Sequence, residues 1–452
     1  MNRNIYHFEQ AYPGTKDCTT DKMQKAVEDW FSLYFQDKVD DWEDPCQRLP
    51  YTIVNKLSRA CFSEYQVFTK QDMPFVQQIL KAVEPVRKKA MQLALIGGEA
   101  WLKPVPKPTG FDVAVMRRDM VTVLGRDAAG NVTDLGSAEV NFRQGAYYTL
   151  LERRSVDEAG SLVIENKLFR SVDGNSIGTQ VPLSTLPEYQ EMQPYMVLPG
   201  LNGIGLVCLR VPMENCVDGS LDGVSVYAAA TGLIHNINHN ERQLSREFEN
   251  GESRVFASAD LLMRRRSGEP TLPPGLFVGL DDDPESTGVT IFSPELRQQS
   301  FLERKREYLR NVETLIGLKR GILGEVEAAQ RTATEVTSSQ GDYSLTIQDL
   351  QQMWEQALHQ LIHICGILGK LCRMPGAKSA LQEKTVCVRW GNGILFDRDK
   401  EWENMMNLVQ AGLLKPEIAL AWRYDLPWQT EEQLQEIRQK YMPENKKDGE
   451  EK

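Results

Sequence analysis

The chain has 452 residues, of which 41% are apolar and 25% are charged, so it can bury sizeable cores in two or more folded regions. Its 52 Lys and Arg residues and 63 Asp and Glu residues give a net charge of −11, which excludes a general electrostatic attraction to DNA or to an anionic membrane surface. No apolar run approaches the roughly 18 residues that would span a bilayer, and the first residues lack the apolar core of a signal peptide, so we expect a soluble protein that is neither secreted nor membrane-bound.

Helical spacing of apolar residues dominates the start of the chain. The pattern predicts helices over residues 21–35 and 73–95, and a further apolar segment covers residues 49–61. From residue 98 to residue 212, short β-branched or aromatic runs alternate with Gly, Asp and Asn clusters, and residues 127–131 are typical of a hairpin turn. These patterns predict a body of helices plus a sheet, not a regular β-α-β array.

A long helix and a small β segment come next. Apolar residues at three- and four-residue spacings predict a helix of about seven turns over residues 224–250, which Asn250-Gly251 terminates. Strand-like stretches follow at residues 254–262 and 275–292. So small a β segment could hardly bury a core by itself. We therefore expect neighbouring elements or other copies of the chain to stabilise it.

Two charged amphipathic patterns, at residues 294–319 and 344–371, predict two further long helices. Pro294 takes a first helical position in the first, and three glycines interrupt the chain from Gly317 onward. A short Thr/Ala/Glu stretch at residues 331–336 opens the second helix, with a threonine as candidate N-cap.

The last region combines one strand-like run, residues 385–390, with short helical patterns around residues 400–410, 416–422 and 431–441. The tail, residues 443–452, is charged and poor in apolar residues, so we expect it to be disordered.

One motif suggests nucleophilic catalysis. Residues 174–178 match the Gly-x-Ser-x-Gly pattern of a nucleophile elbow and would make Ser176 the nucleophile of a serine hydrolase. An elbow needs a helix directly after the serine, whereas residues 179–182 read as strand or loop. A β-turn is therefore the favoured interpretation, and the hydrolase remains the alternative.

Other catalytic, metal or cofactor motifs are incomplete. His235/His239 and His359/His363 have i, i+4 spacing, but neither first histidine is followed by the glutamate of a zincin helix, and no further ligand set accompanies them. Residues 366–371 lack the spacing and the Ser/Thr of a phosphate-binding loop. The eight scattered cysteines form no Cys-x-x-Cys pair and are expected to be reduced thiols. We expect no catalytic residue, metal or cofactor.

Basic residues gather in the small β segment and in the helix that follows it. They are Arg264, Arg265, Arg266, Arg304, Lys305 and Arg306. Because glutamates are interleaved in the helix, a solvated face with intrahelical pairs is favoured over a phosphate-binding stripe. Direct readout of a DNA sequence is not supported.

The stretch from Pro212 to Tyr227, with Asn215, Gly223 and Ser225, resembles the Pro…Asn…Gly-x-Ser-x-Tyr junction before a stem helix in portal proteins of tailed double-stranded DNA bacteriophages with long non-contractile tails. Further landmarks follow in the family's order and cover roughly the whole chain. They are Glu247-Phe248 with Gly251 and Arg254, Phe292 to Arg297, the glycine-broken loop after Leu315, Thr332 to Val336 with Ser338, Thr346 to Gln348, Asp397 with Ala411 to Leu413, and, upstream, Gly97 to Pro104.

The resemblance implies an α+β portal-type subunit that assembles as a ring. Its parts would be a helix-plus-sheet wing at residues 1–223, stem helices at 224–250 and 293–318, a small α/β clip at 251–292, a tunnel-loop region at 319–344, a long wing helix at 345–374, and a helical crown with the tail at 375–452. The ring, typically of about twelve subunits, would be closed by rotational symmetry.

In function, the resemblance implies a non-enzymatic channel at one capsid vertex of the virion, through which double-stranded DNA is packaged and ejected. The subunit would be made in the host cytoplasm, from a phage or a prophage gene. The implied partners are the terminase large subunit, which supplies ATP hydrolysis, head–tail adaptor proteins, and the major capsid and scaffold proteins.

The resemblance also places candidates for the channel constriction in the tunnel loop. They are Glu325, Glu327, Gln330, Arg331 and Thr332. A vertex-associated minor head or adaptor protein without a channel is a second alternative, beside the hydrolase that would use Ser176.

Overall fold

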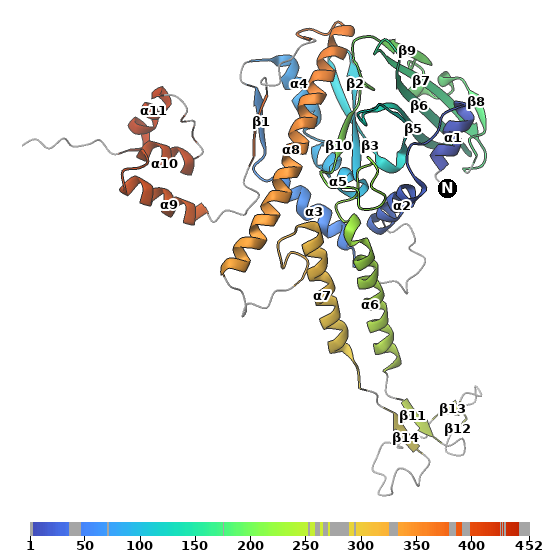
Figure 1. Ribbon diagram of the computed structural model, residues 1–452, viewed down its shortest axis with the longest axis vertical. Coiled ribbons are helices and arrows are strands. Elements are labelled where there is room, and N and C mark those ends of the chain that lie inside the picture. Colours follow the sequence, from blue (N-terminus) through green and yellow to red (C-terminus); the bar gives the residue numbers. More distant parts are fainter. Residues whose placement is uncertain are drawn as a thin grey trace, which may run out of the picture. The chain divides into compact units, whose positions relative to one another are not determined.

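The computed structural model describes residues 3–35, 47–69, 72–174, 176–251, 254–257, 263–264, 270–271, 289–292, 295–324, 333–378, 386–390, 398–424, 426, 428 and 431–442. The chain divides into two compact units, Met1–Trp390 and Gly391–Lys452, whose elements are labelled in Figure 1. Among the described helices, none combines the length and the hydropathy that a membrane crossing requires.

Short helices open the first unit. They are α1 (Arg3–Ala11), α2 (Asp21–Phe35), α3 (Leu49–Cys61), α4 (Pro74–Val83) and α5 (Arg87–Gly97). The prediction of a helix over residues 21–35 is confirmed by α2. The prediction of one helix over residues 73–95 is wrong, because a turn at residues 84–86 separates α4 from α5. Pro85 lies in that turn, where its ring and its missing N–H oppose a continuous helix.

Two antiparallel sheets form the β-rich body predicted for residues 98–212. The smaller sheet has the order β10-β2-β3, from β2 (Glu99–Lys107), β3 (Gly110–Arg117) and β10 (Val207–Arg210). The larger has the order β4-β5-β6-β7-β8, from β4 (Val121–Arg126), β5 (Val132–Arg143), β6 (Ala146–Val156), β7 (Leu162–Ser171) and β8 (Thr179–Val181), with β9 (Tyr195–Leu198) also paired to β7.

The hairpin predicted at residues 127–131 joins β4 to β5. The carboxylate of Asp127 accepts the N–H groups of Ala129 at 2.9 Å and Asn131 at 2.8 Å, and the N–H of Gly130 donates to the carbonyl oxygen of Asp127. These bonds close the turn with the Asp side chain, as the composition predicts.

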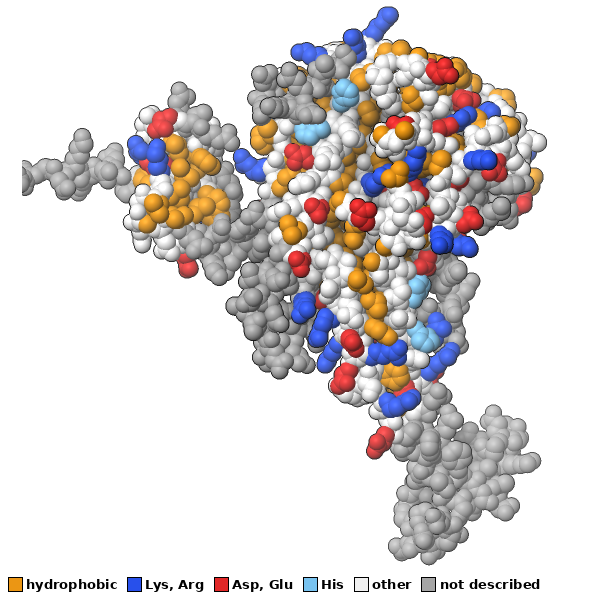
Figure 2. Space-filling model, viewed as in Figure 1, with side chains coloured by type: hydrophobic (Ala, Val, Ile, Leu, Met, Phe, Trp, Pro, Cys, Tyr) orange, Lys and Arg blue, Asp and Glu red, His pale blue; other side chains and the backbone are white. Residues whose placement is uncertain are grey.

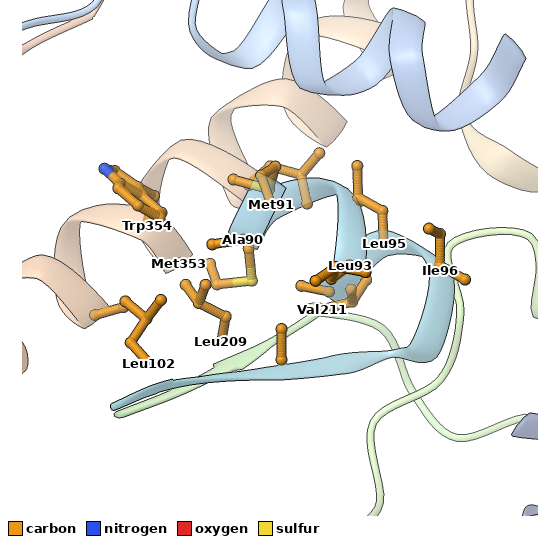
Figure 3. Close-up of a cluster of buried hydrophobic side chains, with 14 of the residues drawn as sticks. Ala90, Met91, Leu93, Leu95, Ile96, Leu102, Leu209, Val211, Met353 and Trp354 are labelled. Carbon is orange, nitrogen blue, oxygen red and sulfur yellow. The ribbon is translucent and has the colours of Figure 1, made fainter. Parts of the chain in front are cut away.

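The main core lies where α5 and the long helix α8 (Ala333–Leu371) pack on the smaller sheet. Figure 3 shows Met91 and Leu95 of α5 and Trp354 of α8 beside Leu102 of β2 and Leu209 of β10. All five side chains are at most 1% exposed. Burial of such side chains contributes about 1.5–3 kcal/mol each to stability, so this cluster fixes α8 on the sheet.

Two helices pack side by side beyond this core, α6 (Thr231–Asn250) and α7 (Gln298–Ile316) (Figure 1). Both begin later than predicted. The predicted start of the first helix at residue 224 is wrong because residues 224–230 are held in contacts with α2 and α5, and only Ala228–Ala230 form a 3-10 turn. The second helix does not begin at Pro294, since Arg297 is its N-cap residue.

Short antiparallel strand pairs are described between α6 and α7. They are β11 (Arg254–Ala257) with β14 (Val289–Phe292) and β12 (Met263–Arg264) with β13 (Pro270–Thr271). The two predicted strand-like stretches thus pair with each other where they are described.

Helix α8 is continuous from Ala333 to Leu371, so the stretch predicted to open the second long helix belongs to it from Ala333 onward. The helix therefore takes in the second half of the region that the sequence assigns to the tunnel loop, residues 319–344. Beyond α8, β15 (Val386–Arg389) confirms the strand predicted at residues 385–390. It pairs with β1 (Gln66–Thr69), a strand that the sequence does not predict.

The second unit contains α9 (Arg398–Gln410), α10 (Pro416–Arg423) and α11 (Glu431–Tyr441), which confirms the three helices predicted there. The carboxylate of Glu417 is buried and accepts the guanidinium of Arg438 at 2.6 Å, which joins α10 to α11. The tail at residues 443–452 lies outside the described residues.

Candidate functional site at the junction before α6

Asn215 organises residues 212–230, the segment that leads into α6 and is here named the junction. Its Oδ1 accepts the N–H groups of Val217 at 2.9 Å and Asp218 at 3.2 Å. Its Nδ2 donates to Oδ1 of Asp218 at 2.9 Å, Oγ of Ser220 at 3.0 Å and the carbonyl oxygen of Asp222 at 3.2 Å. Only an amide side chain offers an acceptor and two donors at one position, so Asn215 closes this loop onto itself.

Gly223 lies against the start of β2. Its N–H donates to Oε1 of Glu99 at 2.9 Å. A Cβ atom at this position would lie 2.6 Å from both Cγ of Glu99 and the carbonyl oxygen of Gly98. The close approach therefore requires glycine, and it brings the junction onto the smaller sheet.

Ser225 and Val226 bind the end of α5. The hydroxyl of Ser225 and the N–H of Val226 each donate to the carbonyl oxygen of Leu95 at 3.0 Å. Leu95 is in the last turn of α5, where carbonyl groups have no partner within the helix. The junction thus supplies the missing donors and caps α5.

Tyr227 anchors the last residues before α6. Its side chain is 0% exposed, and its hydroxyl donates to the carbonyl oxygen of Trp30 in α2 at 2.9 Å. Burial raises the pKa of Tyr227, so the hydroxyl keeps its proton and remains a donor.

A buried charge cluster supports the same junction. Arg118 lies between two carboxylates, with Nε 3.6 Å from Oε2 of Glu99 and Nη2 3.4 Å from Oδ1 of Asp222. Arg210 also pairs with Glu99 at 2.9 Å, and Arg126 pairs with Asp222 at 2.7 Å. Glu99, Arg118 and Asp222 are at most 6% exposed. Buried charges are tolerated only when they are paired, so this cluster depends on all its members.

Polar contacts also join α6 to α7. The amide of Asn240, which is 1% exposed, donates to the carbonyl oxygen of Phe301 at 3.1 Å. The carboxylate of Glu247 accepts the guanidinium of Arg297 at 2.7 and 2.9 Å and so lies at the N-terminus of α7, where a negative charge is favourable. Charged side chains of both signs are interspersed along this helix pair (Figure 2).

A family model described as Phage portal protein, SPP1 Gp6-like, matches residues 137–446, which is more than half of the chain. The chain belongs to this family. No curated protein gives a significant match to it. Phage portal proteins are structural components of the capsid vertex with a role in genome packaging. The matched range includes the whole junction, both paired helices and α8.

The three predicted basic residues of this portal protein that lie on α7 have different surroundings. Lys305 pairs with Glu241 of α6 at 2.9 Å and donates to Oε1 of Gln47 at 3.2 Å, so both of these side-chain contacts reach other parts of the fold. Nε of Arg304 donates to the hydroxyl of Tyr308 at 2.9 Å, one turn along α7. Arg306 is exposed on α7.

The described structure does not test the other predicted site residues of the portal protein. Arg264 lies in β12, and its side chain is not described. Arg265 and Arg266 lie outside the described residues, and so do all five channel candidates. These are Glu325, Glu327, Gln330, Arg331 and Thr332.

Ser176 of the portal protein does not lie in a nucleophile elbow. Its hydroxyl is 2.8 Å from the hydroxyl of Ser171, and strand β8 follows it where an elbow requires a helix.

Nε2 of His235 is 3.1 Å from the carboxylate of Asp29, and Nε2 of His359 is 3.8 Å from that of Glu355. Within the described part of the chain, no three His, Cys, Asp or Glu residues gather as metal ligands would.

Sequence reasoning missed the charge cluster around Arg118 and identified the junction only through the family resemblance. A signal for the cluster exists at Glu99, because a carboxylate directly precedes the apolar run Ala100-Trp101-Leu102 of a buried strand. Such a charge at the start of a core strand indicates a buried partner.

Proposed function

We propose that this portal protein assembles as a closed ring, of about twelve copies related by rotational symmetry, around a channel for double-stranded DNA. The observation that carries the proposal is the junction at residues 212–230, which joins the helix pair α6–α7 to a packed body through buried bonds. A helix pair fixed in this way suits a subunit whose neighbours pack sideways against it.

The parts of the subunit follow from this proposal. Residues 1–223 form the wing, α6 and α7 form the stem, and residues 251–292 form the clip between them. Residues 319–332 contain the tunnel loop, α8 is the long wing helix, and residues 375–452 form the crown and tail. The short strand pairs described in the clip support its dependence on neighbouring copies, since isolated two-stranded pairs are only marginally stable.

The charge balance supports a passive channel. DNA must slide through a packaging channel in both directions, and strong pairing of Lys and Arg with phosphates would hold it in place. The chain has a net charge of −11, and Lys305 is paired within the subunit. The channel therefore guides DNA without gripping it.

Electron microscopy of the purified full-length protein, together with native mass measurement, tests the ring. We expect closed rings with a central hole. Particles without closed rings under all conditions would contradict the proposal, and a disc without a hole would favour a minor head or adaptor protein instead.

We further propose that residues 325–332 line the narrowest part of the channel. Replacing these residues with a Gly/Ser segment of equal length should stop DNA packaging but leave ring assembly intact. Loss of rings in this variant would show that the segment belongs to the subunit interface.

We propose that the clip binds the terminase large subunit during packaging and head–tail adaptor proteins afterwards, and that the wing contacts the major capsid and scaffold proteins. Exchange of Arg264, Arg265 and Arg266 for serine should weaken capture of terminase by assembled rings. The matched change of Arg143 to serine, in the wing, should leave that capture unchanged. Equal capture by both variants would contradict the assignment.

A further inference from the structure

The carboxylate of Glu313 binds the first residues of the loop that follows α7. Both of its oxygen atoms lie 3.0 Å from the backbone nitrogen of Gly321, and Oε1 accepts the N–H of Leu323 at 2.7 Å. The residue is 3% exposed. Hydrogen bonds to a carboxylate are roughly twice as strong as neutral ones, so these contacts hold residues 318–324, here named the loop root, onto α7.

The helix itself does not need the Glu313 side chain. Gly317 has a φ of 71° and ends α7 in the left-handed conformation. The N–H of Leu318 donates to the carbonyl oxygen of Glu313 at 2.8 Å, and the N–H of Gly317 donates to that of Thr314 at 3.3 Å. This backbone pattern caps a helix C-terminus without any side chain. The carboxylate is therefore free to serve the loop root.

Packing confirms that the loop root folds back along α7. Leu318 is buried in the main core, and a Cβ atom on Gly324 would lie 3.5 Å from Cδ1 of Leu309, one helical turn before Glu313. On the other side, the hydroxyl of Thr346 in α8 donates to the carbonyl oxygen of Gly317 at 3.4 Å. The loop root thus begins between α7 and α8 and runs back beside α7.

We propose that Glu313 is the positioning residue that fixes the loop root to stem helix α7 and thereby sets where the proposed channel loop, residues 325–332, begins. The inference rests on the proposed function of those residues as the channel loop. In α7, Leu309, Val312 and Ile316 form the buried side together with Glu313. A carboxylate on the apolar side of a helix needs partners, and the loop root supplies them.

The change Glu313→Gln tests the contact because it preserves shape but replaces one acceptor oxygen with an NH₂ donor. We expect hydrogen–deuterium exchange at the amides of Gly321 and Leu323 to become faster by about tenfold or more, since charge-assisted bonds to them are lost. The amides of α7 should keep their protection. The matched control is Glu307→Gln, an exposed glutamate on the same helix, which should change neither.

Unchanged exchange at Gly321 and Leu323 in Glu313→Gln would overturn the inference. Loss of protection throughout α7 would overturn it too, because the carboxylate would then hold the helix and not the loop. In assembled rings, Glu313→Gln should lose DNA packaging while Glu307→Gln retains it, and normal packaging despite faster exchange would refute the positioning role. Absence of rings in the unaltered protein would instead contradict the proposed function, because the exchange experiment needs no ring.

Discussion

The hydroxyl of Tyr227 donates a 2.9 Å hydrogen bond to the carbonyl oxygen of Trp30, which joins the residues before α6 to helix α2 in a fully buried site. Tyr227→Phe leaves the packing intact but removes this donor. We expect it to lower the free energy of unfolding by about 1–2 kcal/mol, measured by urea denaturation. Tyr195→Phe, at a tyrosine that is 62% exposed, is the control and should have no measurable effect. Equal stability of both variants would show that the bond contributes nothing.

Gly223→Ala tests whether the junction needs its close approach to β2. The added methyl group would lie 2.6 Å from the backbone oxygen of Gly98, which cannot rotate away. We expect a loss of about 2 kcal/mol or more, seen as a lower melting temperature. In Gly232→Ala, in α6, the new methyl group has no atom within 4 Å beyond its own stretch of helix backbone, so this change should instead stabilise the protein by about 0.5 kcal/mol. A neutral Gly223→Ala would contradict the tight contact.

Arg118→Met tests the buried charge cluster. The change removes the cation between Glu99 and Asp222 and leaves Glu99, which is 0% exposed, with fewer partners. Breaking a buried ion pair costs about 3–5 kcal/mol, so unfolding should require much less denaturant. Arg143→Met removes an ion pair with Glu188 in which the arginine is 52% exposed, and it should cost less than about 1 kcal/mol. Similar losses in the two variants would contradict the account of the cluster.

Glu152, in β6, makes the stability of the protein depend on pH. Burial opposes its ionisation, but Arg154 at 2.7 Å and Lys103 at 2.5 Å outweigh that effect and lower its pKa from 4.5 to about 2. Since the folded-state pKa is lowered, the contribution of about 3 kcal/mol is complete above pH 4.5 and is lost as the pH falls to 2.

The difference in unfolding free energy between the unaltered protein and Glu152→Gln should therefore be largest near pH 6 and shrink toward pH 2. Denaturant titrations at a series of pH values measure it. Glu191→Gln, at an exposed glutamate, serves as the control and should show no such trend. A difference that is independent of pH would show that Glu152 acts through its shape and not its charge.

Local sequence patterns predict much of the fold. The spacing in α2 and the turn chemistry at Asp127 act within a few residues, and both predictions are confirmed. The predictions fail where distant contacts decide. Residues 224–230 have the apolar spacing of a helix, yet Ser225 bonds to Leu95 of α5 and delays the start of α6. Strand β1 was not predicted because its partner β15 is more than 300 residues away.

The site could be predicted only in part for the same reason. Pro212 to Tyr227 has a recognisable pattern because its roles belong to particular side chains. The charges of Glu99, Arg118 and Glu313 reveal their partners only after folding, since an isolated acidic or basic residue usually lies on a solvated surface.

In two hydrogen bonds that hold the junction onto α2 and α5, the donor is a side chain and the acceptor is the main chain. Ser225 and Tyr227 use side-chain donors, but their acceptors are main-chain oxygens of Leu95 and Trp30. Helices α2 and α5 can therefore exchange side chains, within the limits of packing, without losing these bonds. Substitutions in α2 and α5 are thus separated from the attachment of the segment that leads into α6, and either helix can change its surface while that attachment stays unaltered.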